Sequence, residues 1–300
     1  MPVSTKLIQS RISSVKNTRK ITKAMELVAA SKMRKATARV IASRPYSKMA
    51  WEIISELSRT GKADHPLLVK RELINKILVV LITSDRGLCG GFNAQIIKRT
   101  VEFFKSSEGK DIDIIACGKY AERAARKNKK KAIAFFNDLA NNPAYRDVAP
   151  VGKLVIDEYS KGSYEKVMLA FTDFKSAISQ IPRIMPLLPL EPITGLGEVG
   201  EEEKSDEAKL PVNYEYKFEP NIREVLDKML PRLVETQIYQ AILESAASEH
   251  SARMVAMKNA SDSATEMIDD LTFTFNQARQ AGITKEILEI SSGKIALENN

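Results

Sequence analysis

The residues best placed to do chemistry form a glycine-rich turn, DRGLCGGFN at 85–93, which follows the apolar segment KILVVLIT at 76–83. A glycine-rich turn between a strand and a helix is where mononucleotide and dinucleotide folds bind phosphate. Here Gly87, Gly90 and Gly91 do not have the G-x-G-x-x-G spacing, and no Lys-Ser or Lys-Thr pair follows them as it does in a P-loop. We therefore interpret the turn as a tight strand-to-helix connection that requires small residues.

Other reactive side chains are few. The two cysteines, Cys89 and Cys117, and the two histidines, His65 and His250, do not favour a four-ligand metal site. Both cysteines lie in or beside apolar segments, which is typical of reduced core thiols, and a disulfide between them is the alternative. The sequence contains no H-E-x-x-H, G-x-S-x-G or C-x-x-C motif. It therefore predicts no catalytic, cofactor-binding or metal-ligating residue in this chain.

Strand-like and helix-like segments alternate through residues 75–190. Helices are expected from about Asn93, after Gly118 and near 148–160. This alternation predicts a central Rossmann-like α/β domain with a largely parallel sheet. Residues 191–213 are acidic and contain glycine, so we expect a linker there. The expected strands are KILVVLIT at 76–83, IDIIAC at 112–117, AIAFF at 132–136 and YEKVMLAF at 164–171.

Residues 1–60 predict one long helix. Uncharged positions recur at steps of three or four residues, which defines a single stripe on a helix whose other faces carry Lys and Arg. Pro45 is expected to bend or break this helix near Ser43. The stripe consists of Ile8, Ile12, Val15, Thr18, Thr22, Met25, Ala29, Met33, Ala36 and Val40.

Residues 214–300 predict a second long helix. One set of positions alternates steps of four and three, which is the repeat of a coiled-coil seam. Half of the residues between 241 and 264 are Ala or Ser, so a partner helix can approach closely. His250 lies in the seam, where we expect it to be packed and not catalytic. The seam consists of Leu243, Ala247, His250, Met254, Met257, Ser261, Ala264, Ile268, Leu271, Phe275 and Ala278.

The charge distribution indicates how the two helices pair. The chain carries a net charge of +8, with fourteen basic and three acidic residues in 1–62 but eight basic and twelve acidic residues in 221–300. A basic helix attracts an acidic one, although each exposed ion pair contributes little. We favour an antiparallel intramolecular coiled coil over separate homodimers of each helix. The predicted fold is thus α/β plus a long antiparallel coiled coil, in which the N- and C-terminal helices pair.

Five long motifs follow one another along the chain. They are ITKAMELVAASKMRK (21–35), SDRGLCGGFN (84–93), YKFEP (216–220), ARMVAMKNA (252–260) and ARQAGITKEILEI (278–290). In this order, and over essentially the whole chain, they resemble the γ subunit of F-type ATP synthases. The resemblance implies a bacterial-type subunit that lacks the regulatory dithiol insertion of the chloroplast form and has no cofactor.

The resemblance also implies a mechanical role. In that family the terminal helices form a coiled coil inside a hexamer of alternating α and β subunits. Rotation of this central shaft couples ion flow through a membrane ring to conformational change and ATP synthesis or hydrolysis in the β subunits. The implied protein is a non-catalytic subunit whose partners are α, β, ε and the ring of c subunits. It would lie peripherally on the cytoplasmic face of the bacterial plasma membrane and bind no nucleic acid.

Individual contacts follow from matching positions in the motifs. The β-subunit catch would be contacted by Lys20, Lys23, Met25, Arg279 and Gln280. The apolar bearing of the hexamer would hold Ile283, Ile287, Ile290 and Leu297. Tyr216 and Glu219 match the foot that contacts the c ring and the ε subunit. The tail SSGKIALENN departs from the small apolar run that usually ends the family.

Two other functional classes fit parts of the sequence. A basic helical arm at 1–62 would suit nucleic-acid binding, but its basic residues surround an apolar stripe and no aromatic residue occurs in 1–45. A nucleotide-dependent enzyme built on 75–190 would need the phosphate-binding residues that the turn at 85–93 lacks. The basic N-terminus also resembles a mitochondrial targeting peptide, although the pattern continues to about residue 58 without a break.

Overall fold

The computed structural model describes residues 5–59, 65–71, 73–140, 143–190 and 221–298. Contacts divide the chain into two compact units, one formed by residues 29–253 and the other by residues 1–28 together with 254–300. The predicted linker at 191–213 lies outside the described residues.

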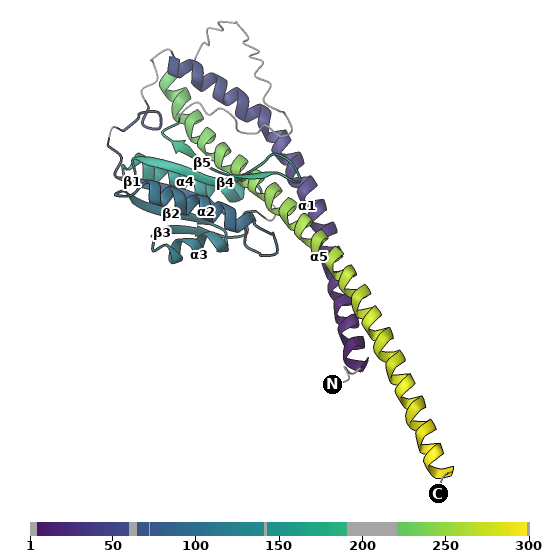
Figure 1. The fold of residues 1–300 in the computed structure, drawn as a ribbon. Coiled ribbons are helices and arrows are strands. Elements are labelled where there is room, and N and C mark those ends of the chain that lie inside the picture. The colour runs from purple at the N-terminus through teal and green to yellow at the C-terminus, as the bar shows by residue number, and fades with distance from the viewer. Residues whose placement is uncertain (1–4, 60–64, 72, 141–142, 191–220, 299–300) are drawn as a thin grey trace. The chain divides into compact units, whose positions relative to one another are not determined.

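The larger unit contains a five-stranded sheet in the order β3-β2-β1-β4-β5 (Figure 1). Strands β1 to β4 are parallel to one another, and β5 is antiparallel to β4. The predicted, largely parallel sheet is therefore confirmed. The strands are β1 (Lys76–Ile82), β2 (Asp111–Cys117), β3 (Ala132–Phe136), β4 (Lys166–Phe174) and β5 (Gln180–Leu188).

Strand β5 was not predicted from the sequence. This strand contains Pro182 and Pro186, which have no N–H to donate to a neighbouring strand. Proline is tolerated at the edge of a sheet, and β5 is an edge strand that pairs with β4 alone. Because proline is typical of loops, Pro182 and Pro186 make this segment look unlike a strand in the sequence.

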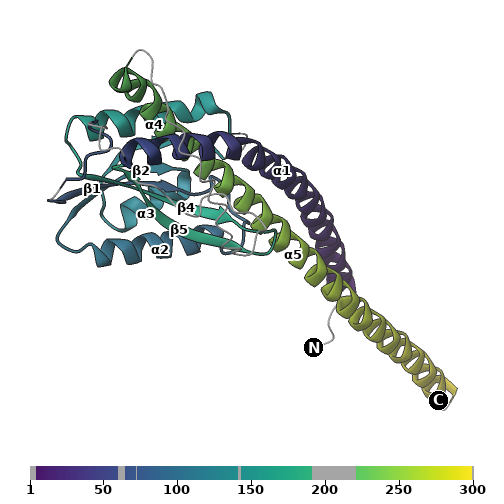
Figure 2. The ribbon, with the colours of Figure 1, turned by 90° about the horizontal axis from the view of Figure 1, so that it is seen from above.

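Helices cover both faces of the sheet (Figure 2). On one face α2 (Phe92–Ser106) and α3 (Lys119–Lys127) pack over a core that includes Val79 and Leu81 of β1. On the other face α4 (Tyr145–Ser160) and the beginning of α5 (Ile222–Glu298) pack over a core that includes Leu78 and Val80. Successive β1 side chains point to opposite faces, and both faces are covered. This explains why β1 is a continuous apolar run.

The smaller unit is an antiparallel pair of helical segments, residues 5–28 of α1 (Thr5–Arg59) and 254–298 of α5 (Figure 1). Arg19 donates to Thr265 at 3.5 Å, and the Thr22 and Ser261 hydroxyls lie 2.7 Å apart. Residue numbers therefore run in opposite directions along the two segments, as predicted.

Both predicted stripes are confirmed by burial. Every position of the seam in α5 is buried or partly buried, and Thr18 is the one exposed position of the stripe in α1. Helix α1 continues through Pro45, so the helix does not break there. Among the described residues, no helix combines the length and the apolar character needed to cross a membrane.

Candidate functional site

The glycine-rich turn lies at the topological switch point of the sheet. Strand β1 has β2 on one side and β4 on the other, so the chain order reverses between β1 and β4. Open α/β sheets bind their ligands in the crevice outside the carboxyl ends of strands at such a point. The turn at 84–91 follows β1 and the hairpin at 175–179 follows β4. These two segments therefore frame the position where a nucleotide would be expected.

Polar side chains of the turn bind the turn itself and its neighbours. The Ser84 N–H donates to Asn93 Oδ1 at 3.0 Å, and Asn93 Nδ2 donates to Ser84 Oγ at 2.7 Å. Asn93 Nδ2 also lies 3.3 Å from Cys89 Sγ. The Asp85 carboxylate accepts the backbone N–H of Lys119 at 3.2 Å. These bonds support the interpretation of the turn as a structural connection.

Helix α5 lies against this edge of the sheet through three serines. Ser245 Oγ accepts the N–H of Thr172 at 3.1 Å, and Ser248 Oγ donates to the Thr172 carbonyl at 3.3 Å. Ser251 Oγ donates to the carbonyl of Ala177 at 2.6 Å. The three serines are spaced three residues apart and so share one face of the helix. Backbone groups at the end of β4 are thus bonded to α5.

Arg253 continues this contact to the turn after β1. Its Nη2 donates to the carbonyls of Arg86 and Gly87, each at 3.2 Å, and its Nε lies 3.4 Å from the Gly87 carbonyl. Its Nη1 lies 2.7 Å from Glu249 Oε1 and 3.3 Å from His250 Nδ1. The side chains of Arg253 and Glu249 are only 11% and 8% exposed. The guanidinium of Arg253 is therefore bonded to the turn that lies at the switch point.

The surroundings of Arg253 determine the charge states of its neighbours. Burial, together with the positive charges of Arg253 and Lys32, lowers the pKa of His250 to about 4. Because a guanidinium can only donate, His250 Nδ1 must accept its hydrogen bond. His250 is thus a neutral, packed ring that is 4% exposed, as predicted. Burial raises the pKa of Glu249, and the adjacent Arg253 opposes that rise.

Neither cysteine has the character of a nucleophile. Cys89 and Cys117 are both free and buried, as predicted for core thiols. Burial raises the pKa of Cys117 to about 12 and also raises the pKa of Cys89. Both thiols are therefore protonated at neutral pH, whereas the thiolate is the reactive form.

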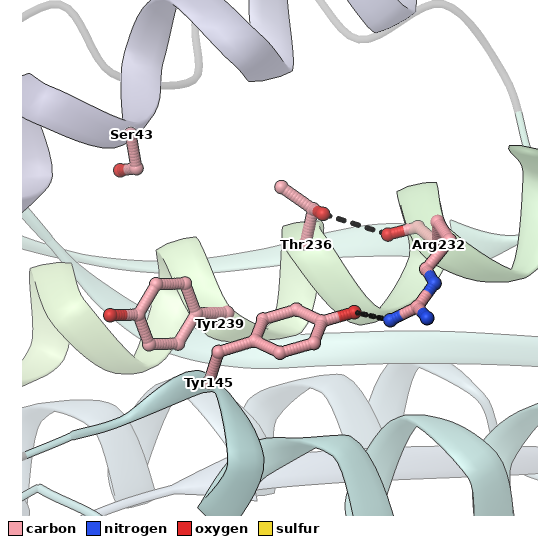
Figure 3. Close-up of a pocket in the computed structure, with 5 residues that line it drawn as sticks. All are labelled: Ser43, Tyr145, Arg232, Thr236 and Tyr239. Atoms are coloured by element: carbon pink, nitrogen blue, oxygen red, sulfur yellow. Dashed lines mark hydrogen bonds between the residues drawn. The ribbon is translucent and has the colours of Figure 1, made fainter.

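A hollow of about 410 Å³ lies where α1, α4 and α5 meet (Figure 3). Arg232 Nη1 donates to the Tyr145 hydroxyl at 3.1 Å, and the Tyr145 and Tyr239 rings meet edge to face at 5.9 Å. Among the described residues, the lining includes no histidine, cysteine or carboxylate that could form an acid–base pair. The lining residues are Ser43, Tyr145, Arg232, Thr236 and Tyr239.

The residues predicted to contact partners in the smaller unit are exposed or partly exposed. Lys20, Lys23, Arg279 and Gln280 are exposed, and Met25 is partly buried. The basic side chains therefore lie outside the seam, which is formed by uncharged side chains, as the stripe in α1 predicts.

The end of α5 exposes apolar side chains. Ile283, Ile287 and Ile290 are 49%, 61% and 74% exposed, and steps of four and three place them on one face of the helix. Contiguous exposed apolar side chains indicate a protein contact surface. The side chain of Leu297 lies outside the described residues, as do Tyr216 and Glu219.

The contact made by Glu249 and Arg253 was not predicted from the sequence. One signal was available: Glu249 and Arg253 each directly precede a seam position, His250 and Met254. A charged residue within a segment rich in Ala and Ser is unusual for a buried seam. Its partners at 86 and 87 could not be found from local pattern, because they lie 167 and 166 residues away.

Comparisons with known proteins agree along the whole chain. A family model described as ATP synthase matches residues 4–297. The chain is 41% identical to the ATP synthase gamma chain of Herpetosiphon aurantiacus, with 98% of this chain and 99% of the relative covered. It is also 41% identical to the ATP synthase gamma chain of Geobacter metallireducens, with 97% of each chain covered.

Solved structures show the same fold. A chain in the central stalk and c-ring structure of the Tetrahymena thermophila mitochondrial ATP synthase has a TM-score of 0.60 at 24% identity, covering 80% of this chain and 99% of that one. A chain of the Euglena gracilis mitochondrial ATP synthase has a TM-score of 0.65 at 18% identity, covering 98% and 94%.

Proposed function

Because the chain belongs to the ATP synthase γ-chain family, we propose that it is the central rotary shaft of an F-type ATP synthase. It would couple ion flow through the membrane ring to conformational change, and so to ATP synthesis or hydrolysis, in the β subunits. The observation that carries this proposal is the antiparallel pairing of the two chain ends through a seam of small residues, as at Thr22 and Ser261. Close approach of two helices makes a rod that resists twisting.

We further propose that this chain is not itself catalytic. At the switch point, where a doubly wound sheet would bind a nucleotide, backbone groups are bonded instead to Arg253 and the serines of α5. The turn that follows β1 uses its polar side chains to bond its own backbone and side chains. In this proposal ATP chemistry takes place in β, and this chain transmits torque.

The partner contacts follow the surfaces of the smaller unit. Exposed Lys20 and Lys23, with Met25, would meet the β catch together with Arg279 and Gln280. Contacts made by screened, exposed charges are weak enough to break and re-form during rotation. The exposed apolar face at the end of α5 would turn in an apolar bearing of the hexamer; Ile283, Ile287, Ile290 and Leu297 are its proposed members.

The remaining partners would be the ε subunit and the ring of c subunits, contacted by a foot that includes Tyr216 and Glu219. The subunit would be held at the cytoplasmic face of the bacterial plasma membrane through these partners. Nucleic acid is not a proposed ligand.

Co-expression with the cognate α and β subunits tests the proposal. Size-exclusion chromatography should show one copy of this chain per hexamer of α and β. Steady ATP hydrolysis by that complex should be far faster than hydrolysis by α and β without this chain. A chain that elutes alone, or as its own dimer, would contradict the proposal and would make binding to random DNA the next measurement.

A further inference from the structure

The contact between α5 and the sheet changes character along the helix. From Leu226 to Ile242 the contact is apolar and belongs to the core shared with α4 and the sheet. From Ser245 to Arg253 the helix also makes side-chain hydrogen bonds to backbone groups of β4 and of the turns that follow β1 and β4, beside a small apolar contact of Ala246 and Ala247 with Phe174. Apolar contact is non-directional, whereas hydrogen bonds require a defined geometry. The polar part therefore determines the rotational setting of α5 on this edge of the sheet.

Arg253 makes the part of this contact that reaches the turn after β1. All three guanidinium nitrogens are engaged: Nε and Nη2 bind the carbonyls of Arg86 and Gly87, and Nη1 binds Glu249. A lysine has a single nitrogen and cannot reproduce this fork of donors. Glu249 orients the guanidinium and balances its charge, which is needed because both side chains are buried.

The residue after Gly87 shows that the turn is held under constraint. Leu88 has a φ of 63°, which is the left-handed region that a leucine seldom adopts. Its side chain is 61% exposed, so apolar burial does little to offset the cost of this backbone conformation. Such a conformation persists where surrounding contacts hold it in place. Arg253 supplies those contacts on one side of Leu88 through the carbonyls of Arg86 and Gly87.

We propose that Arg253, oriented by Glu249, is a latch that fixes the turn at 84–91 to α5, so that the sheet and this helix rotate as one body. Arg253 is thus a positioning residue for coupling. The first half of this inference concerns the chain alone, and the second half rests on the proposed function.

Two measurements on Arg253→Met and Arg253→Lys test the latch. The first is hydrogen exchange of the full chain, read by mass spectrometry for the segment 84–93. The second is the number of ions pumped per ATP hydrolysed by the complete ATP synthase in membrane vesicles. Lys258→Met is the matched control, because Lys258 lies on the same helix and is exposed.

In Arg253→Met we expect exchange of 84–93 to accelerate at least tenfold while the β1 segment 76–82 is unchanged. The ratio of ions pumped to ATP hydrolysed should fall at least twofold. Arg253→Lys should lie between Arg253→Met and the unsubstituted chain, and Lys258→Met should change neither quantity. Glu249→Gln is a second test. It should also accelerate exchange of 84–93 and lower the ratio of ions pumped to ATP hydrolysed, but by less than Arg253→Met does.

Unchanged exchange of 84–93 in folded Arg253→Met and Glu249→Gln would overturn the latch. Faster exchange with an unchanged pumping ratio would overturn its role in positioning. If Arg253→Met fails to fold, hydrogen exchange of the β1 segment 76–82 will also be faster. In that case exchange of 84–93 in Glu249→Gln tests the latch. Failure of the unsubstituted chain to assemble with α and β would count against the proposed function, whereas the exchange experiment would still decide the latch.

Discussion

At the scale of residues, His250 and Glu249 occupy one buried environment but respond to it in opposite directions. Burial disfavours the charged form of each, so it lowers the pKa of the imidazole and raises that of the carboxyl. The positive charges of Arg253 and Lys32 add to the effect on His250, whereas Arg253 opposes the effect on Glu249. The seam therefore holds a neutral ring beside an ion pair.

His250 should make stability depend on pH. Its pKa in the folded chain is about 4, against an ordinary value near 6.5. The unfolded chain takes up a proton below about pH 6.5 and the folded chain does not until about pH 4, so the stability present above pH 6.5 is lost as pH falls through this window. His250→Gln should reduce that loss by about 3 kcal/mol. The free energy of unfolding in urea, measured for the unsubstituted chain and for His250→Gln at pH 7.5 and pH 4, would show this difference.

The control for this prediction uses the second histidine. In a nuclear magnetic resonance spectrum the ring signal of His250 should not titrate above pH 5. This signal should remain in His65→Gln and be absent from His250→Gln. A His250 ring that titrates near pH 6.5 would contradict the expected buried, neutral state.

At the scale of elements, α4 and α5 approach each other closely at Gly152. A Cβ at this position would lie 2.7 Å from Glu235 Cγ and 3.3 Å from Glu235 Cα. Around it Val148, Val151 and Val155 fill the core between α4 and the sheet. The absence of a side chain at Gly152 therefore determines the spacing between the two helices.

Gly152→Ala should destabilise the chain although alanine is the better helix former. The added methyl group meets α5 and forces the helices apart, which costs about 1–3 kcal/mol in a packed interior. Thermal unfolding of the full chain should show a lower midpoint.

Gly282→Ala provides the matched control. Gly282 also lies inside a helix, α5, but an added Cβ there would meet no atom within 4 Å. The midpoint for Gly282→Ala should be unchanged or higher. Equal destabilisation by both substitutions would show that close contact with Glu235 is not the cause.

At the scale of the whole molecule, basic and apolar surfaces are placed in different segments. The first 62 residues carry the excess of positive charge, and the last helix ends in an exposed apolar face. A chain that exposes Ile283, Ile287 and Ile290 leaves apolar surface in water that a partner could bury. Exposed apolar surface is typical of a subunit that binds partners, because its exposure to water is energetically unfavourable in an isolated protein.

Replacing Ile283, Ile287 and Ile290 together by serine should weaken binding to the αβ hexamer at least tenfold. The helix should remain folded because these side chains are exposed in the chain alone. The isolated variant should also aggregate less, since apolar surface is removed. Titration of the hexamer, followed by the rise in ATP hydrolysis, would measure the affinity.

The double variant Lys285→Ser and Glu289→Ser is the control. It removes an exposed pair, 3.6 Å apart, from the same part of α5 while leaving the apolar face intact. An equal loss of affinity in the control would assign the effect to the helix end in general and would contradict the apolar bearing.

Local pattern alone determined much of this protein. The 3.6-residue stripe from Ile8 to Val40 and the 3.5-residue seam from Leu243 to Ala278 predicted two paired helices, because helical periodicity places such positions on one face. Apolar runs predicted β1 to β4. In β1, β2 and β4 these runs reflect burial on both faces, whereas β3 is an edge strand that is only partly buried. The motifs at 21–35 and 252–260 carried the family resemblance, which depends on residue order and needs no structure.

Only the tertiary structure decided which groups meet. It placed β5 at the edge of the sheet, where Pro182 and Pro186 are tolerated. It brought Arg253 to the carbonyls of Arg86 and Gly87, which are backbone atoms that every residue has and that no sequence pattern can mark. Periodicity reports which face of an element is buried, because that property is local. The identity of the covering partner is a long-range property, so the latch between α5 and the turn at 84–91 emerged only when the chain was folded.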